Sequence, residues 1–320
     1  MEPTMKMNHI LFPTDFSECS RALNPEVEWV ANRFQSHVTL LHVFEIPVTW
    51  YGTGEAPLMN AECFQQFAAD AKQRLQDYPL QVPTDRVTRV LAEGGAAWHI
   101  KNWVAEHDVD VIMMGTHGYG PVRRALLGSV AMKLLHDVSC PVWTHSPGET
   151  DQPNRTGVSK IICALELTQE AVSLLRFAKE IAQQFSASVR IIHSVPEIEP
   201  RAYRYFDTDF HKYLKNCAAK DIEQAQHDAA TDFPVSISDG LIGRDTAILA
   251  ASEQADLVVI GRGKTQGILG TLRTHAYDII RQAPCPVLSY CSDQTDAFSE
   301  KRNTSELDCR TENESVIVQR

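Results

Sequence analysis

The sequence predicts an α/β protein made of two tandem, doubly wound domains, each with a five-stranded parallel sheet. Three observations support this prediction. The chain has 320 residues, which is enough for two domains with separate cores. Four apolar landmarks occur in the same order in the two halves of the chain. The segments between these landmarks carry apolar residues at helical spacing, so strands are expected to alternate with helices.

Each half opens with a short apolar run that ends in an acidic residue and then a hydroxyl residue. This pattern is typical of a buried strand that leads into a helix N-cap. The four paired landmarks are NHILFPTDFS (8–17) and SKIICALELT (159–168), VTLLHV (38–43) and VRIIHSV (189–195), DVIMMG (110–115) and DLVVIG (256–261), and CPVW (140–143) and CPVL (285–288). Because the order and the spacing agree, one domain occurs twice.

Helical segments are expected between these strands. In the first half, they are residues 21–34, 61–75, 98–105 and 126–135. Strands that are almost entirely apolar and alternate with helices are typical of a parallel sheet covered on both faces. In such a sheet, ligands bind beyond the carboxyl ends of the strands, where the strand order reverses.

The polar segments of the chain predict its domain boundaries. We expect a first domain at 1–148 and a second at 157–291, joined by a linker rich in Pro, Gly, Thr, Asp and Asn. Residues 292–320 are polar and charged, which predicts a disordered tail.

Composition disfavours several classes of partner. Acidic residues outnumber Lys and Arg by 41 to 30, for a net charge of −11, which argues against nucleic-acid binding. The sequence contains no run of eighteen apolar residues, so no membrane span is predicted. Residues 1–7 lack the features of a secretory signal, and we therefore expect a cytoplasmic protein. The eight cysteines form no C-x-x-C pair and are expected to be free thiols.

The loop that follows the fourth expected strand has the features of a phosphate site. Gly115 and Gly118 flank a turn whose backbone N–H groups can converge on one point. Gly128 and Ser129 then open a helix, and a helix N-terminus favours an anion. Strand, glycine loop and helix start therefore form a candidate polyphosphate cradle.

These motifs resemble those of the universal stress protein family. In its ATP-binding members this loop reads G-2x-G-9x-G-[S/T], and the opening strand ends in P-x-D, matched here by Pro13, Thr14 and Asp15. The second strand commonly ends in L-H-V, as at 41–43, and the terminal C-P-V occurs in both halves. The resemblance covers roughly residues 6–146 and 157–291.

The resemblance implies an adenine nucleotide alpha-hydrolase-like fold with ATP bound in the first domain. Whether Mg²⁺ accompanies the triphosphate, as it does in many such sites, is left open. Asp15 would contact the nucleoside, beside the adenine-facing backbone of Val43. The full implied site is Pro13, Thr14, Asp15, Val43, Met114, Gly115, Thr116, His117, Gly118, Gly128, Ser129 and Val130. Single-domain members usually pair through their final strands, so the two halves should form an internal pseudo-dimer through 142–144 and 287–289.

The second half departs from the family pattern. Its opening strand ends in Ala164, Leu165 and Glu166, and Lys264 and Arg273 stand where the first half has Gly118 and Gly128. Side chains at those two positions would obstruct the approach of a phosphate to the backbone. We therefore expect the second nucleotide site to be lost or altered.

Three functions remain open at this point. The first is an ATP-binding regulatory or stress-tolerance protein, the second is a scaffold that acts only through protein–protein contacts, and the third is a slow ATP hydrolase. No catalytic base can be named for the third, so no catalytic residue is predicted. A P-loop at 263–265 is disfavoured because Val258 stands where that motif needs glycine, and no metal-ligand spacing is present. A homodimer of the whole chain and an unidentified protein partner are left open.

Overall fold

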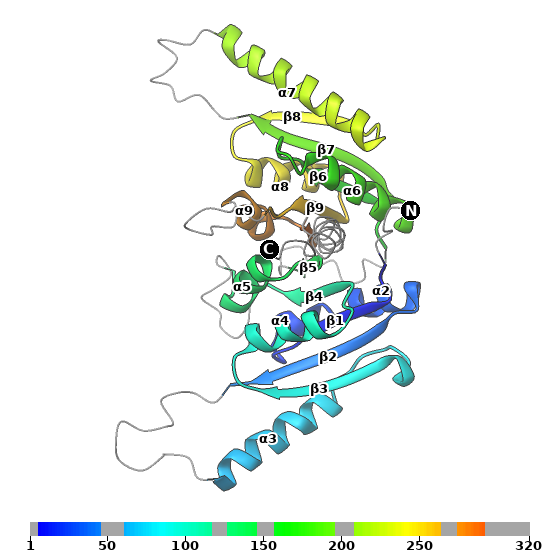
Figure 1. The fold of residues 1–320 in the computed structure, drawn as a ribbon, viewed down its shortest axis with the longest axis vertical. Helices are drawn as coiled ribbons and strands as arrows, with labels where there is room; N and C mark the ends of the chain where they lie inside the picture. Colours follow the sequence, from blue (N-terminus) through cyan, green and yellow to red (C-terminus); the bar gives the residue numbers. More distant parts are fainter. Residues whose placement is uncertain are drawn as a thin grey trace, which may run out of the picture.

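The computed structural model describes residues 6–45, 61–116, 127–145, 157–195, 208–263 and 274–291. In these residues, both halves of the chain contribute to one ten-stranded sheet with the order β3-β2-β1-β4-β5-β10-β9-β6-β7-β8. Figure 1 shows this sheet running the length of the molecule, with the long helices α3 and α7 at opposite ends. Most of the predicted linker and the whole predicted tail lie outside the described residues.

Each half contributes five parallel strands in the order 3-2-1-4-5, which confirms the doubly wound α/β fold. The first half supplies β1 (His9–Pro13), β2 (His37–Phe44), β3 (Val87–Glu93), β4 (Val111–Gly115) and β5 (Val142–His145). The second supplies β6 (Lys160–Ala164), β7 (Ser188–Val195), β8 (Val235–Asp239), β9 (Leu257–Gly261) and β10 (Val287–Tyr290). The strand order reverses between β1 and β4, and again between β6 and β9, so these two points are where a ligand site is expected.

Helices cover both faces of the sheet. The helices are α1 (Glu18–Ala22), α2 (Asn24–Phe34), α3 (Ala61–Gln76), α4 (Ala96–Glu106), α5 (Ser129–Asp137), α6 (Ala171–Phe185), α7 (Thr208–Ala229), α8 (Ile242–Glu253) and α9 (Thr274–Gln282), with a short 3₁₀ turn η2 (Thr84–Arg86). Helices α2, α3, α6 and α7 bury apolar residues against one face, and α4, α5, α8 and α9 against the other. Each of the two apolar cores contains residues from both halves, so the halves share their cores.

The helix expected at residues 21–34 is in fact two helices. Helix α1 ends at Ala22, and α2 begins after Leu23, with Pro25 in its first turn. Proline is favoured at a helix start because it lacks the N–H group that a helix interior needs. Ser17 caps α1, since its hydroxyl oxygen accepts a 3.2 Å hydrogen bond from the backbone N–H of Ser20.

The two halves meet through their final strands, which confirms the predicted internal pseudo-dimer. Strands β5 and β10 pair antiparallel, with Trp143 opposite Leu288. All three residues of each predicted contact segment are buried. On one face, the rings of Trp29 and Phe185 stack across the junction at 5.3 Å. Strand pairing and apolar burial therefore hold the halves together.

Two further expectations concern thiols and membranes. The seven cysteines in the described residues are all free, and Cys140, Cys163, Cys285 and Cys291 are buried. Burial raises the pKa of the Cys140 and Cys163 thiols to about 12. None of the helices in the described part of the chain combines the length and apolar character that a membrane span requires.

Candidate functional site

The chain leaves β1 at the point where the strand order of the first half reverses. The backbone N–H of Thr14 still donates to the carbonyl oxygen of Leu41 on β2, at 2.9 Å. Phe16 then takes a φ of 63°, in the left-handed region, which turns the chain toward α1. The hydroxyl of Thr14 is buried and contacts the Phe16 N–H and the Ser20 hydroxyl, both at 3.1 Å. The side chain of Thr14 therefore shapes this turn from inside, behind the half-buried Pro13 and Asp15.

Within the part of the chain that the structure describes, the carboxylate of Asp15 is held through one of its two oxygens. Its Oδ1 accepts hydrogen bonds from the backbone N–H of Ser17 at 2.9 Å and from the hydroxyl of Ser20 at 3.0 Å. Within the described ranges, Oδ2 accepts none. A half-buried carboxylate oriented through one oxygen can accept hydrogen bonds from a ligand through the other.

His42 supports this turn from β2. Its Nδ1 lies 2.8 Å from the carbonyl oxygen of Thr14, which accepts, so Nδ1 carries the proton. The centre of its ring lies 4.1 Å from the centre of the Phe16 ring. The guanidinium of Arg74, on α3, lies 4.6 Å from the centre of the same Phe16 ring. Burial lowers the pKa of His42, and Arg74 lowers this pKa further, while the hydrogen bond to Thr14 and the charge of Asp15 oppose the shift. A histidine in a strand carries no sequence signal for this bond, so the structure alone reveals it.

The end of β4 approaches α1 closely. A Cβ atom at Gly115 would lie 2.8 Å from Sγ of Cys19, so a glycine is needed here unless Cys19 moves. The next residue, Thr116, is buried, and its N–H and hydroxyl donate to the carbonyl oxygen of His145 at 3.0 and 3.2 Å. Gly115 and Thr116 are thereby fixed between α1 and β5.

Thr116 also fixes the start of α5. Its carbonyl oxygen accepts a 2.8 Å hydrogen bond from the N–H of Gly128, the N-cap residue of α5. No side chain of the described residues caps this helix. The N–H groups of its first turn, including those of Ser129 and Val130, have no partner within a helix. Such a helix start favours an anion.

The structure brings most of the predicted site residues to one edge of the sheet. Met114 belongs to the core cluster against which Val43 and Val130 pack as partly buried residues. His117 and Gly118 lie outside the described residues, as do Lys264 and Arg273 in the second half.

The second half repeats the backbone of this site. The N–H of Leu165 donates to the carbonyl oxygen of Ile192 at 2.9 Å, as Thr14 does to Leu41. Nδ1 of His193 lies 2.8 Å from the carbonyl oxygen of Leu165, as His42 does from that of Thr14. The duplicated sequence therefore builds the same scaffold twice.

The side chains of the second site differ, and they are acidic. A pocket at the reversal between β6 and β9 is lined by Glu166, Thr168, Glu170 and Tyr290 over an apolar floor. A Cβ atom at Gly263 would lie 2.5 Å from Oε2 of Glu170, so this carboxylate lies against the loop that follows β9. Carboxylates at this position repel phosphate groups.

A polar network also replaces the apolar side of the first site. Val43 pairs with Ala92 in the first half, whereas Ser194 pairs with Ser238 in the second. The two serine hydroxyls lie 2.6 Å apart, and both donate to Oδ2 of Asp245, at 3.1 and 2.7 Å.

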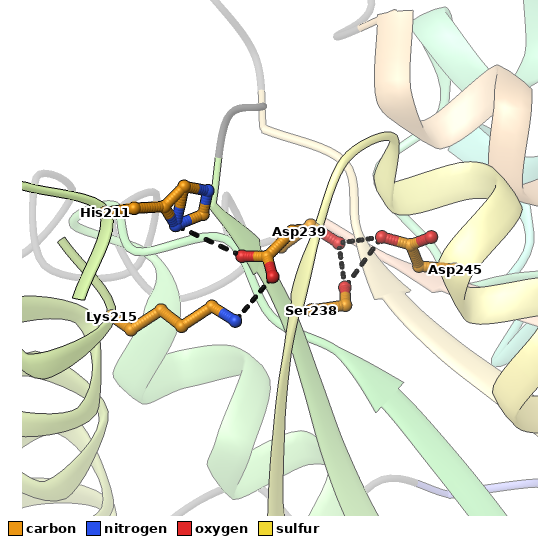
Figure 2. A network of polar contacts seen from close by, with 6 residues as sticks. His211, Lys215, Ser238, Asp239 and Asp245 are labelled. Carbon is orange, nitrogen blue, oxygen red and sulfur yellow. Dashed lines mark hydrogen bonds and ion pairs between the residues drawn. The ribbon is translucent and has the colours of Figure 1, made fainter. Parts of the chain in front are cut away.

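Asp239, the next residue along β8, faces α7 instead and forms a separate cluster, as Figure 2 shows. Its carboxylate lies 2.5 Å from Nζ of Lys215 and 3.4 Å from Nδ1 of His211. At the strand pair where the first half has Val43 and Ala92, the second half therefore presents two hydroxyls that bind a carboxylate. Among the described residues, no group of three His, Cys, Asp or Glu side chains could hold a metal ion.

Comparisons with known proteins agree with this architecture. The model of the "Universal stress protein family" matches residues 6–144 and again residues 157–290. The chain is 30% identical over 142 residues to "Universal stress protein A homolog 1" of Coxiella burnetii, covering 43% of this chain and 95% of that protein.

Two solved structures share the fold over nearly the whole chain. A universal stress protein from Archaeoglobus fulgidus has a TM-score of 0.62 at 18% identity, covering 90% of this chain and 97% of that one. A putative universal stress protein from Pseudomonas aeruginosa has a TM-score of 0.58 at 17% identity, covering 93% and 98%. At these identities the likeness concerns the fold alone.

Proposed function

Because the chain belongs to the universal stress protein family, as two family domains in tandem, we propose that it is an ATP-binding regulatory protein of stress tolerance. The nucleotide site lies in the first domain, at the reversal between β1 and β4. The observation that carries this proposal is the carboxylate of Asp15, which is oriented through Oδ1 and offers Oδ2 at the edge where a nucleoside would lie. A universal stress protein from Archaeoglobus fulgidus has been solved in complex with dAMP.

In this proposal, Oδ2 of Asp15 accepts hydrogen bonds from the ribose hydroxyls. The backbone of Val43 faces the adenine, and Pro13 and Thr14 shape that wall of the site. The ribose and the inner phosphates meet the backbone from Met114 to Gly118.

The outer phosphates meet Gly128, Ser129 and Val130 at the start of α5. The 2.8 Å bond from the Gly128 N–H to the Thr116 carbonyl oxygen supports this arrangement, since it joins the two ends of the site. Magnesium would be held mainly by the phosphates and water, because the described residues offer no cluster of acidic or histidine ligands.

The second domain does not bind ATP in this proposal. Glu166 stands where Asp15 stands, Glu170 lies against the loop after β9, and both line the pocket there. A triphosphate would meet two carboxylates in place of N–H donors, which disfavours it. We therefore expect one ATP per chain.

The experiment is a calorimetric titration of the whole chain with Mg²⁺ and ATP. One site per chain supports the proposal, and two equivalent sites would contradict it. Absence of binding would favour the protein-contact scaffold instead. Phosphate release at saturating ATP, measured on the same sample, distinguishes a hydrolase from a binding protein.

A further inference from the structure

Arg262 occupies the position in the second half that Thr116 occupies in the first. Each residue directly follows the glycine that ends its strand, Gly115 in β4 and Gly261 in β9. Each donates its backbone N–H to the last strand of its own half, Thr116 to the carbonyl oxygen of His145 at 3.0 Å and Arg262 to that of Tyr290 at 2.7 Å. The backbone is therefore equivalent, and only the side chains differ.

The side chain of Arg262 crosses into the first domain. It is 3% exposed, and its Nη1 donates to the carbonyl oxygens of Leu135 and Val138 at 2.7 and 2.8 Å. Its Nη2 donates to the carbonyl oxygen of Cys140. All three acceptors belong to the last turn of α5 or to the residues just after it.

These acceptors lie at the end of α5 that is opposite the proposed phosphate site. The last carbonyl groups of a helix have no partner within it and carry partial negative charge, so a cation there is favourable. The guanidinium supplies that cation together with three directed donors. Within the described residues its hydrogen-bond acceptors are these carbonyl groups and no carboxylate, so α5 and the residues just after it hold the guanidinium.

Helix α5 has nine residues and is fixed at both ends. At its start, Gly128 is bonded to Thr116, and at its end Arg262 binds the carbonyl groups. Its buried face, formed by Ala131, Leu134 and Leu135, packs on the sheet between these ends. A helix this short moves as a rigid rod, so a shift at its end also displaces its start.

We propose that Arg262 is a positioning residue for the nucleotide site of the first domain. Arg262, just after β9, holds the end of α5, so ATP binding by the first domain depends on the second. This inference rests on the proposed function. It also gives the second domain a role that its own altered pocket does not supply.

The test compares Arg262→Met, Arg262→Lys and a matched control, Arg190→Met. Arg190 is also in the second domain, but its Nε pairs with Glu253 of the same domain at 3.0 Å. Folding is checked by circular dichroism and thermal unfolding, and the affinity for Mg²⁺ and ATP by calorimetry at a temperature where each variant is folded. We expect Arg262→Met to weaken ATP binding on the order of tenfold, a typical size for coupling between sites. Arg262→Lys should fall between it and the wild type, and Arg190→Met should match the wild type.

Hydrogen exchange gives a readout that a merely structural role would not change. Because coupling is reciprocal, ATP should slow amide exchange in residues 257–263 of the second domain in the wild type. Arg262→Met should abolish this ATP effect, which the loss of a merely structural contact would leave in place.

A folded Arg262→Met variant with wild-type affinity would overturn the inference and leave the proposed function intact. If that variant does not fold, unchanged affinity in Arg262→Lys overturns it in the same way. A wild-type chain that binds no ATP would overturn the proposed function, and the inference with it.

Discussion

Thr144 and Ser289 lie on opposite strands of the central pair, and each donates its hydroxyl to a carbonyl oxygen of the other's strand. Thr144 donates to Val287 and Ser289 donates to Val142, both at 3.1 Å. Both side chains are buried, at 1% and 0% exposure. The two bonds are related by the internal symmetry of the chain, and they link the two domains at the middle of the sheet.

We expect Thr144→Val and Ser289→Ala each to lower the free energy of unfolding by about 0.5–1.5 kcal/mol, the usual net value of one hydrogen bond. The measurement is chemical denaturation of the whole chain. The control is Ser252→Ala, whose hydroxyl also donates to a carbonyl oxygen, that of Leu249 at 2.9 Å, but at an exposed position. Equal losses in the control and the two interface variants would show that the central bonds add nothing of their own.

Gly115→Ala should destabilise the first domain because its new methyl group would meet Sγ of Cys19 at 2.8 Å. Overpacking of this kind costs about 1–3 kcal/mol. The matched control is Gly261→Ala, at the equivalent position of the second domain, where the nearest atom is Cδ2 of Leu174 at an ordinary 3.5 Å. Adding Cys19→Ala to Gly115→Ala should restore most of the lost stability. A double variant as unstable as the single one would place the strain elsewhere.

Asp15→Ala should weaken ATP binding by about 1.5–3 kcal/mol, the range for hydrogen bonds to a charged group. The equivalent change in the second domain, Glu166→Ala, should leave ATP affinity unchanged. Gly118→Lys, which copies the residue of the second half into the first, should abolish ATP binding without unfolding the domain. Calorimetry measures all three. Equal effects of Asp15→Ala and Glu166→Ala would contradict a site confined to the first domain.

Burial lowers the pKa of His42 and of His9, and this predicts a loss of stability in mild acid. Between the lowered pKa of the folded state and the unfolded value of about 6.5, only the unfolded chain binds the proton. The contribution of these two histidines to the free energy of unfolding is therefore fully present above about pH 6.5, and it is lost as the pH drops through that window. Each histidine contributes a slope of at most about 1.4 kcal/mol per pH unit.

His42→Asn should reduce that slope, because the asparagine amide can still donate to the Thr14 carbonyl oxygen but does not titrate. The control is His227→Asn on α7, whose side chain is 83% exposed. Denaturation curves between pH 5 and 8 measure both variants. An unchanged slope in His42→Asn would mean that other groups cause the acid sensitivity.

Sequence patterns predicted most of the fold because the strands are nearly all apolar and because the same strand segments occur in the same order in both halves of the chain. The resemblance to the family predicted which strands join the two halves. The break between α1 and α2 was missed, although Pro25 signals a helix start, because apolar spacing continues across Leu23.

The sequence could not predict the contacts that depend on three-dimensional placement. Arg262 stands in a glycine-rich loop and has the sequence features of a surface cation, yet it is buried against the other domain. The orientation of the Asp15 carboxylate also depends on Ser20, whose hydroxyl donates to Oδ1 from five residues further along the chain. Ser20 carries no sequence signal for this contact.

The strands β5 and β10 that pair antiparallel belong to one chain, so the two copies that meet there need not be identical. In a symmetric dimer of two identical chains, every substitution appears twice, so a change that improves one site alters both. Fusion places the two copies in one polypeptide, at a fixed ratio of one to one that dilution does not change. Arg262 can therefore bind the other domain while its counterpart Thr116 binds its own domain. The two halves can thus acquire different functions.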